Sequence, residues 1–141
     1  ESMPCRIKYY FHKCVFFTLY LGLESHCDVS KVGVHCYGAL DGTVYLRLDI
    51  EYNEICLIKD PSGKPIELFK RKNKTNFMNG SLKHRSEFYF NNGTLKIRNI
   101  ERSDAGEYSS ETFNSSGITI TSIRFQLSIE GKYPTVKTLI S

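Results

Sequence analysis

The side chains of this sequence that could bind a metal or form a covalent bridge are concentrated in two His-Cys pairs. His26-Cys27 and His35-Cys36 are followed by a further thiol, Cys56. Structural zinc sites use Cys and His ligands, but at closer spacings than these and within knuckle turns. Two further cysteines, Cys5 and Cys14, lie within residues 1–26, which are an expected signal peptide. In an oxidising compartment, the three cysteines that remain instead predict one disulfide and one free or intermolecular thiol, with the pairing left open. We therefore expect no metal site and no cofactor.

Recognisable catalytic motifs are absent. The sequence has no Gly-x-Ser-x-Gly nucleophile motif, no phosphate-binding loop and no pair of carboxylates in a recognisable frame. An enzyme would have to assemble its site from scattered residues. We therefore predict a protein that is not an enzyme and has no small-molecule substrate, with a secreted metal- or thiol-using protein as a distant alternative.

Four Asn-x-Ser/Thr sequons indicate a protein of the secretory pathway. They begin at Asn73, Asn79, Asn92 and Asn114, and four are more than chance usually places in a chain of 141 residues. We predict glycosylation at these positions, which requires each of them to face solvent. The expected location is extracellular, either on the cell surface or secreted.

The first 26 residues are expected to be a signal peptide. Basic residues precede the apolar run 15–23, which is too short to span a bilayer but suits the hydrophobic region of a signal peptide. The alternative is that this run is a buried first strand. From residue 26 onwards, 16 of the 19 Lys and Arg and 13 of the 15 Asp and Glu remain. A net charge of about +3 is too small to argue for a nucleic-acid partner.

The stretch from Asn92 to Tyr108 predicts both a strand and the corner that follows it. Leu95 and Ile97 alternate with polar residues, as in a half-buried antiparallel strand. Asp104, Gly106 and Tyr108 then stand two residues apart, which is the sequence of a tyrosine corner. We expect the Tyr108 hydroxyl to donate a hydrogen bond to backbone upstream and Gly106 to adopt a positive φ.

Further strand patterns surround this corner, and no amphipathic helix is visible. Turn residues recur about every ten positions, so the sequence predicts one all-β domain over residues 30–131, built as two packed antiparallel sheets. The basic run 70–74 is equally consistent with a solvated loop or edge and with a binding role. The strands are expected at residues 32–40, 43–50, 55–59, 66–69, 86–90, 94–100, 107–113 and 119–129.

Two features typical of such sandwiches are missing. The position two residues after the corner Tyr is Ser110 rather than Cys, and its expected partner on the second strand is Leu46 or Leu48. Leu57 lies near the place of the usual third-strand Trp. We therefore expect a sandwich that lacks the inter-sheet disulfide and is held by aliphatic packing.

Four segments of the sequence are the most informative about its family: CYGALDGTVYLRLDI, ICLIKDPSGKPIELFK, NGTLKIRNIERSDAGEY and FQLSIEGKYPTVKTLIS. Together they resemble the first domain of the cluster-of-differentiation-two-like lymphocyte adhesion receptors, which are relatives of the signaling lymphocytic activation molecules. The resemblance covers residues 37–141, and the absent Trp departs from it. It implies an immunoglobulin-like V-type sandwich, with residues 132–141 forming a linker and the start of a second domain.

The resemblance also implies a binding face on the sheet made by the third, fourth, sixth and seventh strands. Phe113 falls where the family has an exposed aromatic anchor, with Ser109 and Glu111 facing outward on the same strand. Lys59, Glu67 and Lys70 are expected to flank the anchor. The alternative is that Phe113 only covers the end of the sheet.

The implied partner is another immunoglobulin-superfamily protein on an apposed cell, either a different protein or a second copy. The implied role is cell adhesion or co-stimulation in the immune system, as the ectodomain of a membrane receptor. A soluble decoy or mimic that carries the same face is the second interpretation.

Overall fold

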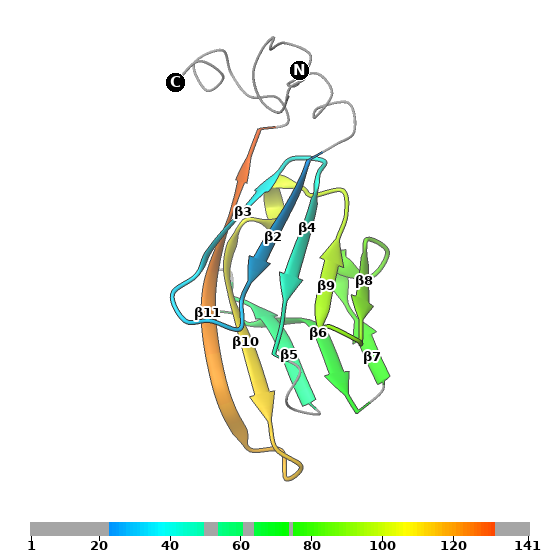
Figure 1. Cartoon of the computed structure of the whole chain (residues 1–141), viewed down its shortest axis with the longest axis vertical. Coiled ribbons are helices and arrows are strands. Elements are labelled where there is room, and N and C mark those ends of the chain that lie inside the picture. Colours follow the sequence, from blue (N-terminus) through cyan, green and yellow to red (C-terminus); the bar gives the residue numbers. More distant parts are fainter. Residues whose placement is uncertain (1–22, 50–53, 61–63, 74, 132–141) are drawn as a thin grey trace.

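Two β-sheets pack face to face to form the domain (Figure 1). The computed structural model describes residues 23–49, 54–60, 64–73 and 75–131. Over these residues it contains two short 3-10 helices, η2 (Gly80–Leu82) and η3 (Arg102–Asp104), and no helix that is long and apolar enough to cross a membrane. The strands are β2 (Glu24–Asp28), β3 (His35–Ala39), β4 (Thr43–Arg47), β5 (Glu54–Lys59), β6 (Ile66–Lys72), β7 (Thr75–Met78), β8 (Ser86–Tyr89), β9 (Thr94–Ile97), β10 (Gly106–Phe113) and β11 (Thr119–Glu130).

The larger sheet has six strands in the order β3-β11-β10-β5-β6-β7. Its pairings are antiparallel except at one edge, where β3 runs parallel to β11. The long β10–β11 hairpin extends to the lower end of the molecule in Figure 1. Register shifts interrupt β5–β6 between Leu57 and Ile58, and β10–β11 between Thr112 and Phe113.

The smaller sheet has four strands in the order β2-β4-β9-β8. Here β2 runs parallel to β4, and the other pairs are antiparallel. The predicted alternation in β9 is confirmed, because Leu95 and Ile97 are buried while Thr94 and Lys96 are only partly buried. One face of this sheet therefore covers the core, and the other faces solvent.

Aliphatic and aromatic side chains from both sheets fill the core between them. The positions where a second-to-sixth-strand disulfide would lie hold buried Leu46 and Ser110, so that bridge is absent as predicted. Leu57 is fully buried at the place considered for the Trp. The largest fully buried side chains of the core are Phe69, Leu46, Ile55, Leu57, Leu95, Ile100 and Leu127.

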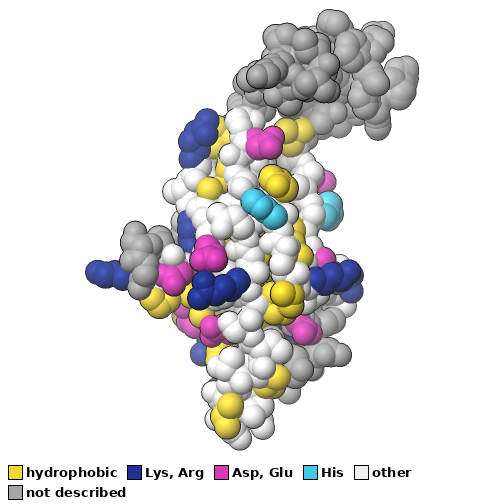
Figure 2. Space-filling view, turned by 90° about the vertical axis from the view of Figure 1, so that its left-hand side faces the viewer, with side chains coloured by type: hydrophobic (Ala, Val, Ile, Leu, Met, Phe, Trp, Pro, Cys, Tyr) yellow, Lys and Arg dark blue, Asp and Glu magenta, His cyan; other side chains and the backbone are white. Residues whose placement is uncertain are grey.

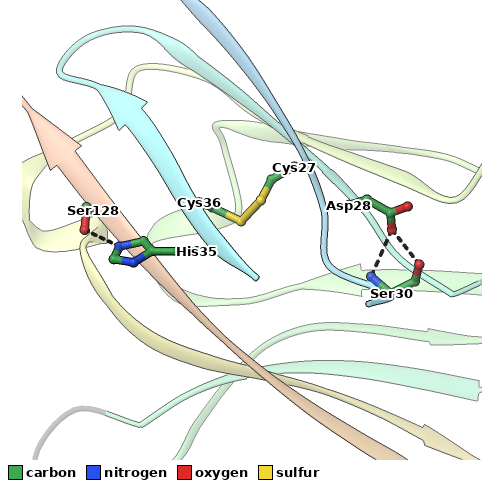
Figure 3. Close-up of a disulfide and its surroundings, with 6 residues drawn as sticks. All are labelled: Cys27, Asp28, Ser30, His35, Cys36 and Ser128. Carbon is green, nitrogen blue, oxygen red and sulfur yellow. Dashed lines mark hydrogen bonds between the residues drawn. A yellow bond between two sulfur atoms is a disulfide. The ribbon is translucent and has the colours of Figure 1, made fainter. Parts of the chain in front are cut away.

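A different disulfide does join the sheets, which corrects the expectation of a sandwich with no bond between them. Cys27 of β2 is bonded to Cys36 of β3, and these strands belong to different sheets (Figure 3). The bridge arises because the chain leaves the smaller sheet after β2 and enters the larger one at β3. Cys56 is the free thiol among the described residues.

The folded unit begins earlier than the predicted residue 30. Strand β2 covers residues 24–28, so the last three residues of the predicted signal peptide lie in this strand. Residues 1–22 and the predicted linker 132–141 lie outside the described residues. Strand β7 was not predicted, and the basic run at residues 70–72 belongs to β6 rather than to a loop.

Candidate functional site

The tyrosine corner fixes how the chain enters β10. Tyr108 is buried, and its hydroxyl donates a hydrogen bond of 2.5 Å to the carbonyl oxygen of Asp104. Burial is the main cause that raises the pKa of Tyr108 above its usual value. Gly106 has a φ of 144°, which L side chains rarely adopt. The predicted roles of Tyr108 and Gly106 are therefore confirmed.

Asp104 also forms a buried ion pair that the sequence interpretation missed. The guanidinium of Arg85 contacts both carboxylate oxygens, at 2.8 and 3.0 Å, and hydrogen bonds with Asp104 are the main cause that raises the pKa of Arg85. Glu101 donates its backbone N–H to the same carboxylate. Arg85 stood outside the corner motif, so only a search for a buried basic partner to Asp104 could have found it.

Ser109, Glu111 and Phe113 face outward on β10, as predicted. They alternate with buried Tyr108, Ser110 and Thr112 along the strand. All three are partly buried rather than fully exposed. Phe113 lies across from Glu54 of β5 and Thr119 of β11, at the register shift. We call this surface of the larger sheet, which faces away from the core, the outer face.

Lys59 does not flank Phe113, which corrects the prediction for this residue. It pairs across the sheet with Tyr108, so its side chain lies on the inward side at the end of the sandwich. Its ammonium donates a hydrogen bond to the Ser103 carbonyl and lies 5.5 Å from the centre of the Tyr108 ring. Burial lowers the pKa of Lys59. Lys59 therefore belongs to the tyrosine corner.

Glu67 and Lys70 do lie on the outer face, where each has a partner. The ammonium of Lys70 is 3.7 Å from a carboxylate oxygen of Glu54. The thiol of Cys56 donates a hydrogen bond of 3.2 Å to Glu67. Across the sheet, Cys56 stands between Glu111 of β10 and Lys70 of β6.

Cys56 is a buried thiol beneath these charged side chains. Burial, followed by the hydrogen bond with Glu67, raises the pKa of Cys56 to about 12. The thiolate is the reactive form of cysteine, so Cys56 is unreactive at neutral pH. Over the described residues, no group of three or more His, Cys, Asp or Glu side chains is placed to hold a metal ion.

Exposed apolar side chains of the larger sheet were missed by the sequence interpretation. Phe77 is 57% exposed and pairs with Lys70, which places it in the row of Glu111 and Cys56. At the other edge, Ile120 of β11 is 42% exposed and Tyr37 of β3 is 54% exposed. Alternation from the buried residues of β3 and β11 could have found Tyr37 and Ile120, whereas Phe77 lies in the unpredicted β7.

Paired charges lie between these apolar ends. Arg124 of β11 is 3.3 Å from Glu107 of β10, and Ser122 contacts Glu111. A groove of about 350 Å³ adjoins them, and Ile58, Ser109, Glu107, Glu111 and Arg124 are among its lining residues. Figure 2 shows the side of the molecule that carries β3 and β11: acidic and basic side chains lie together in the middle, and hydrophobic side chains lie beside them, above them and at the lower end.

Three of the four sequon asparagines are exposed, and Asn114 is partly buried. Asn73 lies in the β6–β7 turn, Asn92 between β8 and β9, and Asn114 between β10 and β11. The Asn114 side-chain oxygen accepts hydrogen bonds from the N–H groups of Ser116 and Ile118, which organises the hairpin tip.

No family model matches the sequence, and no curated protein matches it. Solved structures do match its fold. The CD2-binding domain of CD58 is 21% identical over 74% of this chain and 53% of its own, with a TM-score of 0.53. This chain therefore spans about half the length of that one.

Two further structures align over more of their own length. The first immunoglobulin-like domain of human CD48 is 15% identical over 72% of this chain and 85% of its own, with a TM-score of 0.59. CD84 is 16% identical over 72% of this chain and 99% of its own, with a TM-score of 0.57. At these identities the likeness shows the fold, which is the predicted immunoglobulin-like V-type sandwich.

Proposed function

We propose that this domain is an extracellular recognition module of the CD2-like adhesion type. It binds an immunoglobulin-superfamily protein on an apposed cell through the outer face of the larger sheet. Phe113 on β10 and Phe77 on the edge strand β7 act as anchors in neighbouring cross-strand rows of this face. Glu111 and Lys70 lie in the row of Phe77, Ser109 and Glu67 lie in the next row, and these four residues set the register of the contact.

One observation carries this proposal. Among the residues that the structure describes, four of the seven exposed large hydrophobic side chains belong to the outer face of the larger sheet or to the β10–β11 hairpin, and none lies in a strand of the smaller sheet. Scattered exposed apolar residues are normal, but their concentration on one side is typical of an interaction surface. The four are Tyr37, Phe77, Ile118 and Ile120.

The charges of this face suit a weak and selective contact. Lys70 is paired with Glu54 and Arg124 with Glu107, so each of these two basic side chains is matched by a carboxylate on the neighbouring strand. Such pairs reject a partner that presents like charges, while the exposed aromatic side chains supply binding energy. One neighbouring structure is the CD2-binding domain of CD58, which supports a protein partner.

The same face would serve a soluble secreted decoy equally well, and this is our second candidate. Both candidates imply that the four sequons carry glycans, and both place the protein outside the cell. Neither uses catalysis or a cofactor.

The test is binding of multivalent domain to cells that each display one immunoglobulin-superfamily ectodomain, a second copy of this chain included. Phe113→Ala and Phe77→Ala should each weaken binding to the partner found, by about 2 kcal/mol or more in free energy. Both variants should unfold within about 0.5 kcal/mol of the parent, because they alter the surface.

Val32→Ala is the matched control, because Val32 is 87% exposed and lies outside both sheets. It should change neither binding nor stability. Normal binding by well-folded Phe113→Ala and Phe77→Ala proteins would move the site to another surface. Loss of folding in Phe113→Ala would assign that ring to the core instead.

A further inference from the structure

Strand β7 forms one edge of the larger sheet, and part of its backbone points away from that sheet. Asn79 follows β7 directly in an extended conformation, and its N–H donates a hydrogen bond of 2.9 Å to the Leu68 carbonyl of β6. In an antiparallel pair, alternate residues turn both their N–H and C=O groups toward the partner strand. Phe77 and Asn79 therefore bond to β6, whereas the backbone groups of Asn76 and Met78 point to the open edge.

The usual protection of an edge strand is missing from β7. Charged side chains on an edge strand discourage pairing with another chain, and the edges of the smaller sheet carry them, as Asp28 on β2 and Glu87 on β8. The other edge of the larger sheet, β3, is joined to β2 by the disulfide. Strand β7 has no charged side chain, and its Phe77 is 57% exposed. Among the strands that the structure describes, β7 is therefore the edge best suited to pair with another chain.

The open edge of β7 is complementary to a second copy of itself. When two copies pair antiparallel with Phe77 opposite Phe77, Asn76 of each copy lies opposite Met78 of the other. The outward N–H and C=O groups of these residues then form hydrogen bonds with each other in both directions. The two Phe77 rings meet at a position without ladder hydrogen bonds, where opposite side chains approach most closely. Aromatic pairs across two strands stabilise such a contact.

Two sequons lie at the two ends of this strand. Asn73 is in the turn before β7, and Thr75 is the hydroxyl residue of its sequon, while Asn79 comes directly after the strand. Both asparagines are exposed. In the register with Phe77 opposite Phe77, Asn79 of one copy lies opposite Thr75 of the other. Each end of the pair thus brings two sequons together, and glycans on them would occupy the space that the second copy needs.

We propose that β7 pairs with the β7 of a second copy and that glycans on Asn73 and Asn79 prevent this pairing. Occupancy of these two sequons then decides between monomer and dimer. Opposite residues of paired strands face the same side, so the two outer faces form one continuous surface in the dimer. A dimer with two such faces binds its partner with higher avidity. The role of the glycans rests on the extracellular placement in the proposed function, whereas the pairing of β7 does not.

The experiment compares the chain secreted from mammalian cells with a variant that lacks both sequons, Thr75→Ala combined with Ser81→Ala. Both substitutions change exposed side chains, and they keep the hydrogen bonds of Asn79 with Gly80 and Glu67. Sedimentation equilibrium over a wide range of protein concentration measures the mass. The glycosylated parent should have the mass of one chain, and the variant should form a dimer as the concentration rises.

Asn76→Pro, placed in that variant, tests the edge itself. It removes an N–H that β6 does not use, and edge strands tolerate proline at such positions. The symmetric dimer loses this hydrogen bond on both sides of its axis, so its Kd should rise about tenfold or more. Asn76→Ala keeps the N–H and is the matched control, with an unchanged Kd. Phe77→Asp changes an exposed side chain and should abolish the dimer, because it sets like charges opposite each other.

Three results would overturn the proposal. The first is a variant without these sequons that stays monomeric at every concentration. The second is a dimer that persists with both Asn76→Pro and Phe77→Asp, since this would place the contact elsewhere. The third is a glycosylated parent that dimerises like the variant, or mass spectrometry that finds Asn73 and Asn79 unoccupied. None of these results depends on the cell-binding test of Phe113, so the two proposals can fail separately.

Discussion

Asp104 and Tyr108 hold the end of the sandwich through two independent sets of bonds. The Tyr108 hydroxyl uses the Asp104 backbone carbonyl, whereas Arg85 uses the Asp104 carboxylate. Tyr108→Phe removes only the first and leaves a buried carbonyl without its donor, so it should cost about 1–3 kcal/mol of unfolding free energy. Urea denaturation of the variant and the parent measures this difference.

Ser109→Ala is a suitable control, because Ser109 neighbours Tyr108 but faces outward and is only partly buried. Its unfolding free energy should stay within about 0.5 kcal/mol of the parent. Equal midpoints for Tyr108→Phe and the parent would show that the hydroxyl contributes nothing to stability.

Cys56 makes stability depend on pH in the alkaline range. Burial favours the neutral thiol and raises its pKa from 9.0 to about 12 in the folded chain. Because the folded pKa is the higher one, this stabilisation is complete below pH 9 and is lost as pH rises toward about 12. Thermal melts of the parent and of Cys56→Ala across this range should therefore converge as pH rises.

A maleimide assay checks the same inference independently. Folded parent should label at Cys56 very slowly at pH 7.5, and chain unfolded in guanidinium should label fast. Rapid labelling of the folded protein would contradict the burial of this thiol.

Side-chain positions that depend on a local motif were predicted correctly from the sequence. A side-chain position that depends on pairing across the sheet was predicted wrongly. The spacing of Asp104, Gly106 and Tyr108 is enough to predict the tyrosine corner, because the hydrogen bond from the Tyr108 hydroxyl to the Asp104 carbonyl joins residues only four positions apart. The position of Lys59 depended on its register with β10, and a register shift in the β5–β6 hairpin precedes it. A change of register by one residue moves a side chain to the opposite face, and sequence alone does not show such a shift.

The link between β2 and β3 should contribute measurably to stability. The Cys27–Cys36 bond closes a loop with a sequence separation of 9. Chain-entropy arguments give about 2–3 kcal/mol for a loop of this size. Reduction should lower the unfolding free energy by that amount in the Cys56→Ser background, which removes the remaining thiol of the described residues.

A paired Cys27→Ala and Cys36→Ala protein should melt like the reduced form. If reduction leaves the melting temperature unchanged, the first strands are held by packing and backbone pairing alone.

Most strands were predictable because each has its own alternating pattern, whereas β2, β7 and the disulfide were not. Strand β2 falls at the end of a segment that resembles a signal peptide. Strand β7 has only four residues between two polar stretches. The three cysteines that follow the predicted signal peptide permit three single pairings, and only the crossing from one sheet to the other brings Cys27 and Cys36 together.

Across the whole face, charge and apolar anchors should affect different steps of binding. Lys70→Glu reverses a partly exposed charge beside Glu54, so it should mainly slow association with the partner identified by the cell array. At about 1 M salt the screening length falls to about 3 Å, and the difference from the parent should vanish. Surface plasmon resonance at several salt concentrations measures this effect.

Phe113→Ala should behave in the opposite way, with faster dissociation at every salt concentration, since it removes buried contact area. A salt-independent loss of binding in Lys70→Glu would instead place Lys70 among the buried anchors.

The pairing of β11 on both sides also determines how the domain bears mechanical load. Strand β11 is twelve residues long, lies between β10 and β3, and accepts a further bond at Glu130 from the backbone of Leu40. A pulling force applied between residue 130 and the outer face acts along the strands. It therefore loads the backbone hydrogen bonds between β11 and its neighbours at the same time, in shear, instead of breaking them one after another. Resistance to such a pull is governed by the rate of unfolding rather than by the unfolding free energy. Because the Cys27–Cys36 disulfide joins β3 to β2, the edge strand β3 cannot separate from β11 without also transmitting force to the smaller sheet.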